Sequence, residues 1–199
     1  MEILIIKNGD IKYKEDFANL IIYTGKDLFY TIFGDKAKEI LKQLYTLKNN
    51  QFSYELTNFA IYNNKIAGMV LSYSYDDLMK TSLNTGLLLI KIMKFDFFIN
   101  LIKFIKSFTK LSIVNKDEYY ISNIAVYPEF RGLGIGKSLL FYTERLAKDK
   151  NLKKLSLDVE RENISAIEIY KKFGFKIVKE FEINFSNKKF YFYKMEKSL

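Results

Sequence analysis

Cysteine and histidine are both absent from this sequence, and these absences restrict its chemistry more than any residue that is present. A chain without cysteine has no disulfide, no thiol nucleophile and no thiolate metal site. A chain without histidine lacks the usual Ser-His and Cys-His catalytic pairs, and most zinc sites as well. We therefore expect no metal centre, and a general base has to be a carboxylate, a tyrosine, a lysine or a water molecule.

Arginine is scarce in a chain whose formal net charge is +9, because Arg131, Arg145 and Arg161 are its only arginines. A basic balance is typical of proteins that bind nucleic acid, anionic lipid or a phosphorylated ligand. The many lysines, however, accompany many isoleucine, asparagine, tyrosine and phenylalanine residues, which indicates a genome-wide compositional bias. No basic stripe alternates with stacking aromatic residues, so we do not expect a nucleic-acid partner.

Long apolar runs and targeting patterns are missing too. No stretch of about 18 apolar residues is free of charge, so the sequence predicts no membrane-spanning helix. Residues 1–6 enter an apolar run directly and include the acidic Glu2, unlike the basic start of a signal peptide. We expect a cytoplasmic protein that does not enter the membrane, built as a single domain over residues 1–199.

The apolar periodicity predicts a mixed α/β layout in which helices pack on a partly splayed sheet. Alternating or β-branched apolar runs predict strands over residues 2–7, 58–62, 66–73, 119–126, 154–160, 175–183 and 189–195. Apolar residues at helical spacing predict helices over residues 14–22, 35–47, 134–148 and 164–173. The last of these begins after Asn163, a good N-cap residue, and ends at Gly174, a good residue to stop a helix.

Residues 75–116 are unusual because about forty residues join two strands where a few would suffice. Within them, residues 95–110 are amphipathic and present a wide face rich in phenylalanine. We interpret the segment as a helical insertion between the third and fourth strands rather than as a second domain. Its apolar face requires a cover, which is either the acceptor side of the sheet, a second copy in a homodimer, or a membrane surface.

A glycine-rich turn joins the predicted strand 119–126 to the helix that follows it. Gly132, Gly134 and Gly136 alternate there, so the backbone can approach a ligand closely. The free N–H groups of the helix start and the helix dipole favour an anion such as a pyrophosphate. The spacing is not that of a dinucleotide-binding fold, and Arg131 stands where a P-loop has its first glycine.

Two segments resemble motifs of the GNAT (GCN5-related) N-acetyltransferase family. Residues 131–136, Arg-Gly-Leu-Gly-Ile-Gly, resemble its Arg/Gln-x-x-Gly-x-Gly/Ala signature, and residues 163–175 resemble its Asn-x-x-Ala-x-x-x-Tyr-x-x-x-Gly-Phe motif. The close resemblance covers the core at residues 119–182, and this cofactor half is most similar to the ribosomal-protein alanine N-acetyltransferase branch. The resemblance implies the GNAT acyl-CoA N-acyltransferase fold, with acetyl-CoA as cosubstrate and no metal.

The same resemblance implies the positions that hold acetyl-CoA. The pantetheine arm would pair with the strand backbone and lie near the helix N-cap, and the pyrophosphate would rest on backbone amides. These cofactor-binding positions are Ile124, Ala125, Val126, Arg131, Gly132, Leu133, Gly134, Ile135, Gly136, Lys137 and Asn163. Tyr170 would lie near the thioester sulfur as a general acid, although an aromatic residue on a helix is also a common core residue.

Asp158 is our first choice for the general base. It lies on the strand face opposite the apolar residues, twelve positions before Tyr170, where the ribosomal-protein alanine branch carries a glutamate. Its side chain is one methylene shorter than that glutamate, which favours a relay through water. Glu160 and Glu118 are the alternatives, and all three carboxylates could also be solvated residues at the strand edge.

The predicted function is transfer of an acetyl group from acetyl-CoA to a primary amine. Direct attack in a ternary complex is favoured, because no cysteine is present to form an acyl-enzyme. The acceptor is a protein N-terminus, a lysine or a small amine, and no motif chooses among them. The alternative is a non-catalytic CoA-binding module on the same fold. For residues 75–116 we favour a lid over the acceptor, then a homodimer contact, then a membrane surface.

Overall fold

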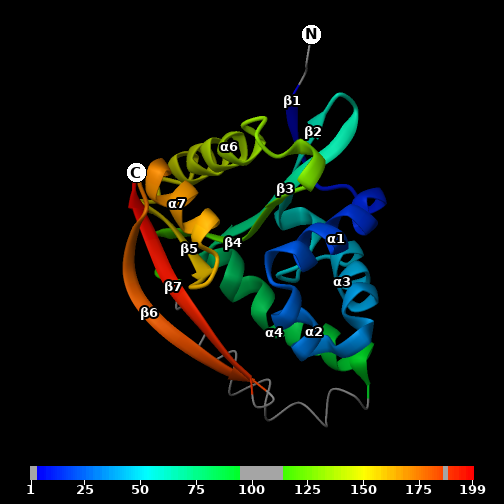
Figure 1. Cartoon of the computed structure of the whole chain (residues 1–199). Coiled ribbons are helices and arrows are strands. Elements are labelled where there is room, and N and C mark those ends of the chain that lie inside the picture. The colour runs from blue at the N-terminus through cyan, green and yellow to red at the C-terminus, as the bar shows by residue number, and fades with distance from the viewer. Residues whose placement is uncertain (1–3, 95–113, 186–187) are drawn as a thin grey trace.

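The computed structural model describes residues 4–94, 114–185 and 188–199, and Figure 1 shows how their helices and strands are arranged. The strands form one seven-stranded sheet in the order β1-β2-β3-β4-β5-β7-β6. Neighbours in the sheet are antiparallel except for the central pair of β4 and β5, which is parallel. The strands are β1 (Leu4–Asn8), β2 (Thr57–Tyr62), β3 (Lys65–Ser74), β4 (Glu118–Val126), β5 (Lys154–Glu160), β6 (Lys176–Phe185) and β7 (Lys188–Ser198).

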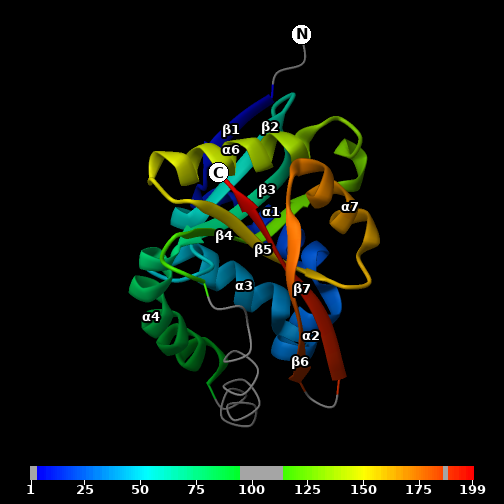
Figure 2. The ribbon, with the colours of Figure 1, turned by 90° about the vertical axis from the view of Figure 1, so that its left-hand side faces the viewer.

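Helices cover both faces of this sheet, as Figures 1 and 2 show from two sides. One face packs on α1 (Lys14–Thr24), α2 (Lys26–Phe33), α3 (Ala37–Thr46) and α4 (Tyr75–Met93) through a buried cluster that contains Phe17, Leu41 and Leu89. The other face packs on α6 (Ile135–Asp149) and α7 (Ile164–Phe173) through a second cluster. No helix in the described ranges is long and apolar enough to cross a membrane.

The two clusters explain the apolar runs at residues 59–61 of β2 and 69–71 of β3. Successive strand residues point to opposite faces, so Phe59 joins the first cluster and Ala60 joins the second. On β3, Met69 and Leu71 join the first cluster while Val70 joins the second. A central strand that is buried on both faces therefore requires an apolar residue at nearly every position.

The sheet opens between its two parallel strands. The pairing of β4 with β5 runs from Glu118 and Lys154 to Ile121 and Leu157 and then stops, although both strands continue. The pairing of β4 with β3 shifts by one residue between Leu71 and Ser72, which leaves Ser122 as the extra residue of a β-bulge. Beyond this bulge, β4 follows β3 and β5 follows β7, so the two halves of the sheet diverge.

The predicted strands and four predicted helices are present within a few residues of their expected bounds. Helix α2, which lies between Gly25 and Gly34, was not predicted from the sequence. Those flanking glycines are typical of a loop. The burial of Phe29, Ile32 and Phe33 in the cluster that they share with α1 and α3 is what stabilises this short helix. The first part of the 75–116 segment is the helix α4, which we had not assigned, and the helix predicted over 95–110 lies outside the described residues.

Candidate active site

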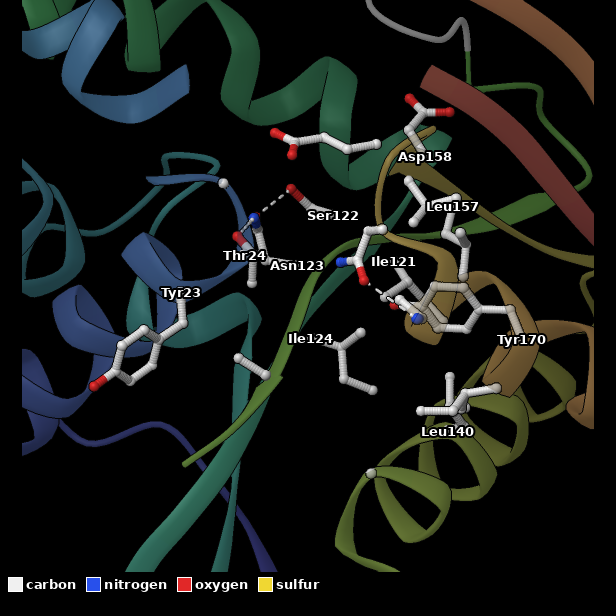
Figure 3. A pocket seen from close by; sticks show the side chains of 18 of the residues that line it. Tyr23, Thr24, Ile121, Ser122, Asn123, Ile124, Leu140, Leu157, Asp158 and Tyr170 are labelled. Carbon is white, nitrogen blue, oxygen red and sulfur yellow. Dashed lines mark hydrogen bonds between the residues drawn. The ribbon is translucent and has the colours of Figure 1, made fainter. Parts of the chain in front are cut away.

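A cavity of about 1130 Å³ lies where β4 and β5 diverge. Figure 3 shows that side chains from β4, β5, α1, α6 and α7 converge on it. Its walls include β4 from Tyr120 to Val126, β5 from Leu157 to Glu160, and the glycine turn at the start of α6. The parallel pairing cannot continue past the bulge, and the resulting gap is the cavity.

The glycine turn at the start of α6 forms one end of this cavity. Gly132 and Gly134 have φ angles of 82° and 75°, a left-handed backbone that favours glycine. A Cβ added at either position would meet nothing within 4 Å, so the backbone of the turn faces open space. Gly136 differs from these two glycines, because its φ is not positive and an added Cβ would make an ordinary 3.7 Å contact with Val126. Only the first two glycines are therefore required by the backbone.

The amides that open α6 point toward the same space. The N-cap residue Gly134 offers no side-chain acceptor, and the amide of Ser138 makes the first bond of the helix, 3.0 Å from the carbonyl oxygen of Gly134. The preceding amides of Ile135, Gly136 and Lys137 belong to the first turn, where a helix has no internal acceptor. Arg131 and Lys137 line the cavity beside them, so this end combines amide donors with two cations.

One edge of β4 is open in the cavity. Ile124, Ala125 and Val126 pair with Val70, Met69 and Gly68 of β3 on one side. On the other side, β5 no longer pairs with them, and all three residues line the cavity. The carbonyl oxygen of Val126 accepts a hydrogen bond of 3.4 Å from Nε of Arg131. An extended ligand could add to the rest of this edge as a further strand.

Helix α7 brings two further residues to the cavity. The Asn163 side chain caps the helix by accepting a hydrogen bond of 3.2 Å from the amide of Ala166, and it also lines the cavity. Tyr170 lies two turns later, half-buried, with its ring 5.9 Å from that of Phe175. Burial raises the pKa of Tyr170 to about 12, so its hydroxyl stays protonated and can donate a hydrogen bond.

Asp158 lies on β5 at the cavity wall and accepts a hydrogen bond of 3.0 Å from the hydroxyl of Tyr120. Burial, together with the nearby Asp158 carboxylate, holds the pKa of Tyr120 well above its usual value. Tyr73 packs beside Tyr120 with ring centroids 5.6 Å apart, and burial raises its pKa to about 12. Both tyrosines are therefore neutral donors, and Tyr120 holds the Asp158 carboxylate in place.

The two alternative carboxylates differ sharply in their surroundings. Glu160 lines the cavity, whereas Glu118 is fully buried in an ion pair with Lys194, whose Nζ lies 2.9 Å away. Burial alone would raise the pKa of Glu118, but hydrogen bonds from Lys194, Asn115 and Ser156 outweigh it and hold that pKa below its usual value. Glu118 thus joins β4 to β7 and β5 and is not available to a ligand in the cavity.

The tertiary structure adds polar residues to the cavity that were not predicted from the sequence. Asn123 donates a hydrogen bond of 2.7 Å to the Thr24 hydroxyl at the end of α1, and it accepts one of 2.8 Å from Ser122 (Figure 3). Tyr120 was missed as well. No sequence signal could have found the contacts of Asn123 with Thr24 and of Tyr120 with Asp158, because these residues are far apart in the chain.

The fold and this cavity define an α/β protein whose parallel strands β4 and β5 separate beside the glycine turn at the start of α6. The profile of the Acetyltransferase (GNAT) family matches residues 26–175, more than half of the chain. The chain belongs to the GNAT acetyltransferase family, and the family resemblance predicted from the two motifs is confirmed.

Individual relatives agree with this placement. A Bacillus subtilis (strain 168) protein provisionally named a ribosomal protein bS18-alanine N-acetyltransferase is 43% identical over 58 residues. That match covers 29% of this chain and only 38% of the relative, so similarity to curated proteins is confined to part of their length. An N-acetyltransferase structure from Staphylococcus aureus Mu50 has a TM-score of 0.71 at 23% identity, covering 96% of this chain and 99% of that one.

A further solved structure is the PaiA N-acetyltransferase from Thermoplasma acidophilum in complex with coenzyme A. It has a TM-score of 0.56 at 16% identity and covers 99% of each chain. At such low identity these structural neighbours show the fold alone. The predicted GNAT fold, with its mixed α/β sheet, is confirmed by them.

Proposed function

We propose that this protein is an N-acetyltransferase that moves an acetyl group from acetyl-CoA to a primary amine. The observation that carries the proposal is the single cavity wall running from the open glycine turn to Tyr170 and Asp158. Membership of the GNAT family supports the same reaction class. Direct attack in a ternary complex is part of the proposal, since the sequence has no cysteine to carry the acetyl group.

In this proposal the backbone binds most of the cosubstrate. The amides of residues 132–137 accommodate the pyrophosphate, aided by the side chains of Arg131 and Lys137. The expected contribution of the Arg131 amide is excluded, because it donates a hydrogen bond of 3.2 Å to the carbonyl oxygen of Pro128. The open edge at 124–126 pairs with the pantetheine arm, and Asn163 lies beside it. The open space at Gly132 and Gly134 supports this fit, because a Cβ there would occupy the approach of a phosphate group.

Asp158 acts as the general base in the proposed reaction. An amine attacks only when neutral, and a lysine-type amine has a pKa of about 10.4. The Asp158 carboxylate, fixed by Tyr120, accepts the first amine proton directly or through a water molecule. The nitrogen then forms the new bond to the thioester carbonyl carbon, the carbon–sulfur bond breaks, and the second amine proton leaves with the thiol product or solvent.

Tyr170 acts as a hydrogen-bond donor to the sulfur that leaves. Complete proton transfer from a phenol of pKa about 12 to a thiolate of pKa about 8.5 would be uphill by roughly 5 kcal/mol. Donation of a hydrogen bond to the developing thiolate has no such cost and still stabilises the transition state. This refines our sequence-based expectation that Tyr170 hands over its proton.

The test compares two variants at the glycine turn. Asn and Asp tolerate the left-handed backbone of Gly134 to a similar degree, and they differ in charge at nearly equal size. We expect acetyl-CoA to raise the melting temperature of the wild type, because a ligand bound only to the native state stabilises it. Either side chain narrows the approach of the phosphate, so both variants should reduce that shift. The added negative charge should make Gly134→Asp lose more of it than Gly134→Asn does. Equal shifts in the two folded variants would contradict a phosphate site at this turn.

Catalysis requires its own measurement. Release of free thiol from acetyl-CoA in the presence of a broad panel of amines would support the enzyme. A protein that binds acetyl-CoA but releases no CoA with any amine would instead be a non-catalytic CoA-binding module. The two measurements together separate a failure of cofactor binding from a failure of turnover.

A further inference from the structure

Charged residues divide the cavity into two ends of opposite sign. Its basic lining residues are Arg131 of the turn before α6, Lys137 at the start of α6, and Lys172 of α7. Its acidic lining residues, Asp158 and Glu160, both belong to β5. Figure 3 shows Tyr170 between Asp158 and α6. A ligand that crosses the cavity therefore passes from a site for anions, past Tyr170, to a site for cations.

The acidic end is also strongly apolar. An added Cβ at Gly25 would lie 3.5 Å from Oε1 of Glu160 and 3.8 Å from both Leu28 and Phe29, so the carboxylate is close to the first turn of α2. Phe192 of β7 is the register partner of Glu160 and lines the same cavity. Phe192 in turn stacks on Phe181, with ring centroids 5.6 Å apart. The carboxylate of Glu160 is thus held among large apolar side chains.

Glu160 has acids rather than bases as its electrostatic neighbours. Burial raises its pKa, and the nearby Glu162 and Asp27 carboxylates raise it further. Within the described ranges, no lysine or arginine forms an ion pair with it. A cation that enters this end gains attraction from several carboxylates in a poorly solvated space. The same carboxylates would repel an anion.

These observations lead to the chemical class of the acceptor. We propose that the acceptor is a primary amine attached to a bulky apolar group, with no carboxylate beside the amine. Its ammonium group would be drawn to Asp158 and Glu160, and its apolar group would pack on Leu28, Phe29 and Phe192. This inference rests on the proposed acetyltransferase function. An arylalkylamine and a peptide that begins with a large apolar residue share this chemistry, and free amino acids do not.

Three matched acceptors test the proposal on the wild-type protein. L-phenylalaninamide has both features, L-alaninamide lacks the bulky group, and L-phenylalanine adds a carboxylate. We expect kcat/KM for phenylalaninamide to exceed that for alaninamide by about 10- to 100-fold, the effect of burying an aromatic side chain. It should exceed that for phenylalanine by at least about 10-fold, because like charges oppose each other at short range. Phenethylamine and a peptide that begins with phenylalanine then distinguish the two sources of such an amine.

Variants separate the charge effect from the acceptor's own chemistry, since a carboxylate also raises the pKa of the amine beside it. The kcat/KM for phenylalaninamide is therefore divided by the kcat/KM for phenylalanine within each protein. Glu160→Gln should reduce this ratio about 5-fold or more, whatever it does to the absolute rate. Glu168→Gln removes a carboxylate from α7 that does not line the cavity, so it should leave the ratio unchanged.

A second pair of variants examines the apolar wall. Leu28→Ser should reduce the ratio of kcat/KM for phenylalaninamide to kcat/KM for alaninamide several-fold, because Leu28 is half-buried in the cavity lining. Leu83→Ser is the control, since Leu83 is 77% exposed on α4. The inference is wrong if the kcat/KM for phenylalanine, alaninamide or a polyamine equals that for phenylalaninamide. It is also wrong if phenylalaninamide is not acetylated. If acetyl-CoA does not raise the melting temperature of the wild-type protein, the proposed function itself is overturned.

Discussion

Replacement of Tyr170 by phenylalanine removes one hydroxyl from the cavity and leaves the ring packed against Phe175. The lost group is a hydrogen-bond donor to a sulfur that becomes negatively charged as the carbon–sulfur bond breaks. A hydrogen bond to a charged group is worth about 1.5–3 kcal/mol. Tyr170→Phe should therefore lower kcat by roughly 10- to 150-fold. The KM for acetyl-CoA should change little, because the interaction forms mainly in the transition state.

The pH dependence offers a second check on the same residue. Burial raises the pKa of Tyr170 to about 12, above the value of an exposed phenol. A raised pKa means that the neutral donor persists through pH 10 and is lost only near pH 12. The pH profiles of the wild type and of Tyr170→Phe should therefore have the same shape near pH 10.

The assay follows thiol release at saturating acetyl-CoA and acceptor across pH 6–10.5. Tyr30→Phe is the matched control, because Tyr30 lies on α2, is 37% exposed and does not line the cavity. If Tyr170→Phe keeps the wild-type kcat, the Tyr170 hydroxyl has no catalytic role and the residue only packs. A decline near pH 10 that disappears in the variant would show that the hydroxyl titrates as an exposed phenol, and the argument from burial would fail.

Further predictions concern the groups around Asp158 and Glu118. Asp158→Asn should slow turnover most at low pH, where the acceptor is protonated, and equal slowing at every pH would argue against a base. Tyr120→Phe should slow turnover about 10-fold and add little to Asp158→Asn in the double variant; additive effects would refute their coupling. Lys194→Met leaves Glu118 buried without its cation. It should therefore lower the free energy of unfolding by about 3–5 kcal/mol and the melting temperature by about 6–20 °C. Lys189→Met, at an exposed position, is the control, and an equal loss there would contradict the buried pair.

The local motifs were predictable because they depend on near neighbours. The turn at Gly132 and Gly134 needs a left-handed backbone that glycine adopts without strain, and that requirement is visible in the residue types. Asn163 and Gly174 bound α7 as expected, through an N-cap and a left-handed C-terminal residue. The helix α2 was missed because its stability comes from burial in the cluster that it shares with α1 and α3 rather than from its own pattern.

The pairing between strands was beyond the reach of the sequence. Tyr120 meets Asp158 only because β4 and β5 are parallel and stop pairing after Ile121 and Leu157. The same geometry buries Glu118 with Lys194 and leaves Glu160 in the cavity, although all three acids looked alike in the sequence. Such contacts depend on the register of residues far apart in the chain, which periodicity does not encode.

The sequence by itself determined the family, the glycine turn and the absence of cysteine and histidine chemistry, because each is fixed by residue identity or by spacing within a few turns of the chain. The tertiary structure decided which carboxylates face the cavity and which charge each end carries. It also brought the apolar wall of α2 and β7 beside Glu160. The physical reason is that burial and long-range charge depend on where distant elements pack, and packing is a property of the whole fold.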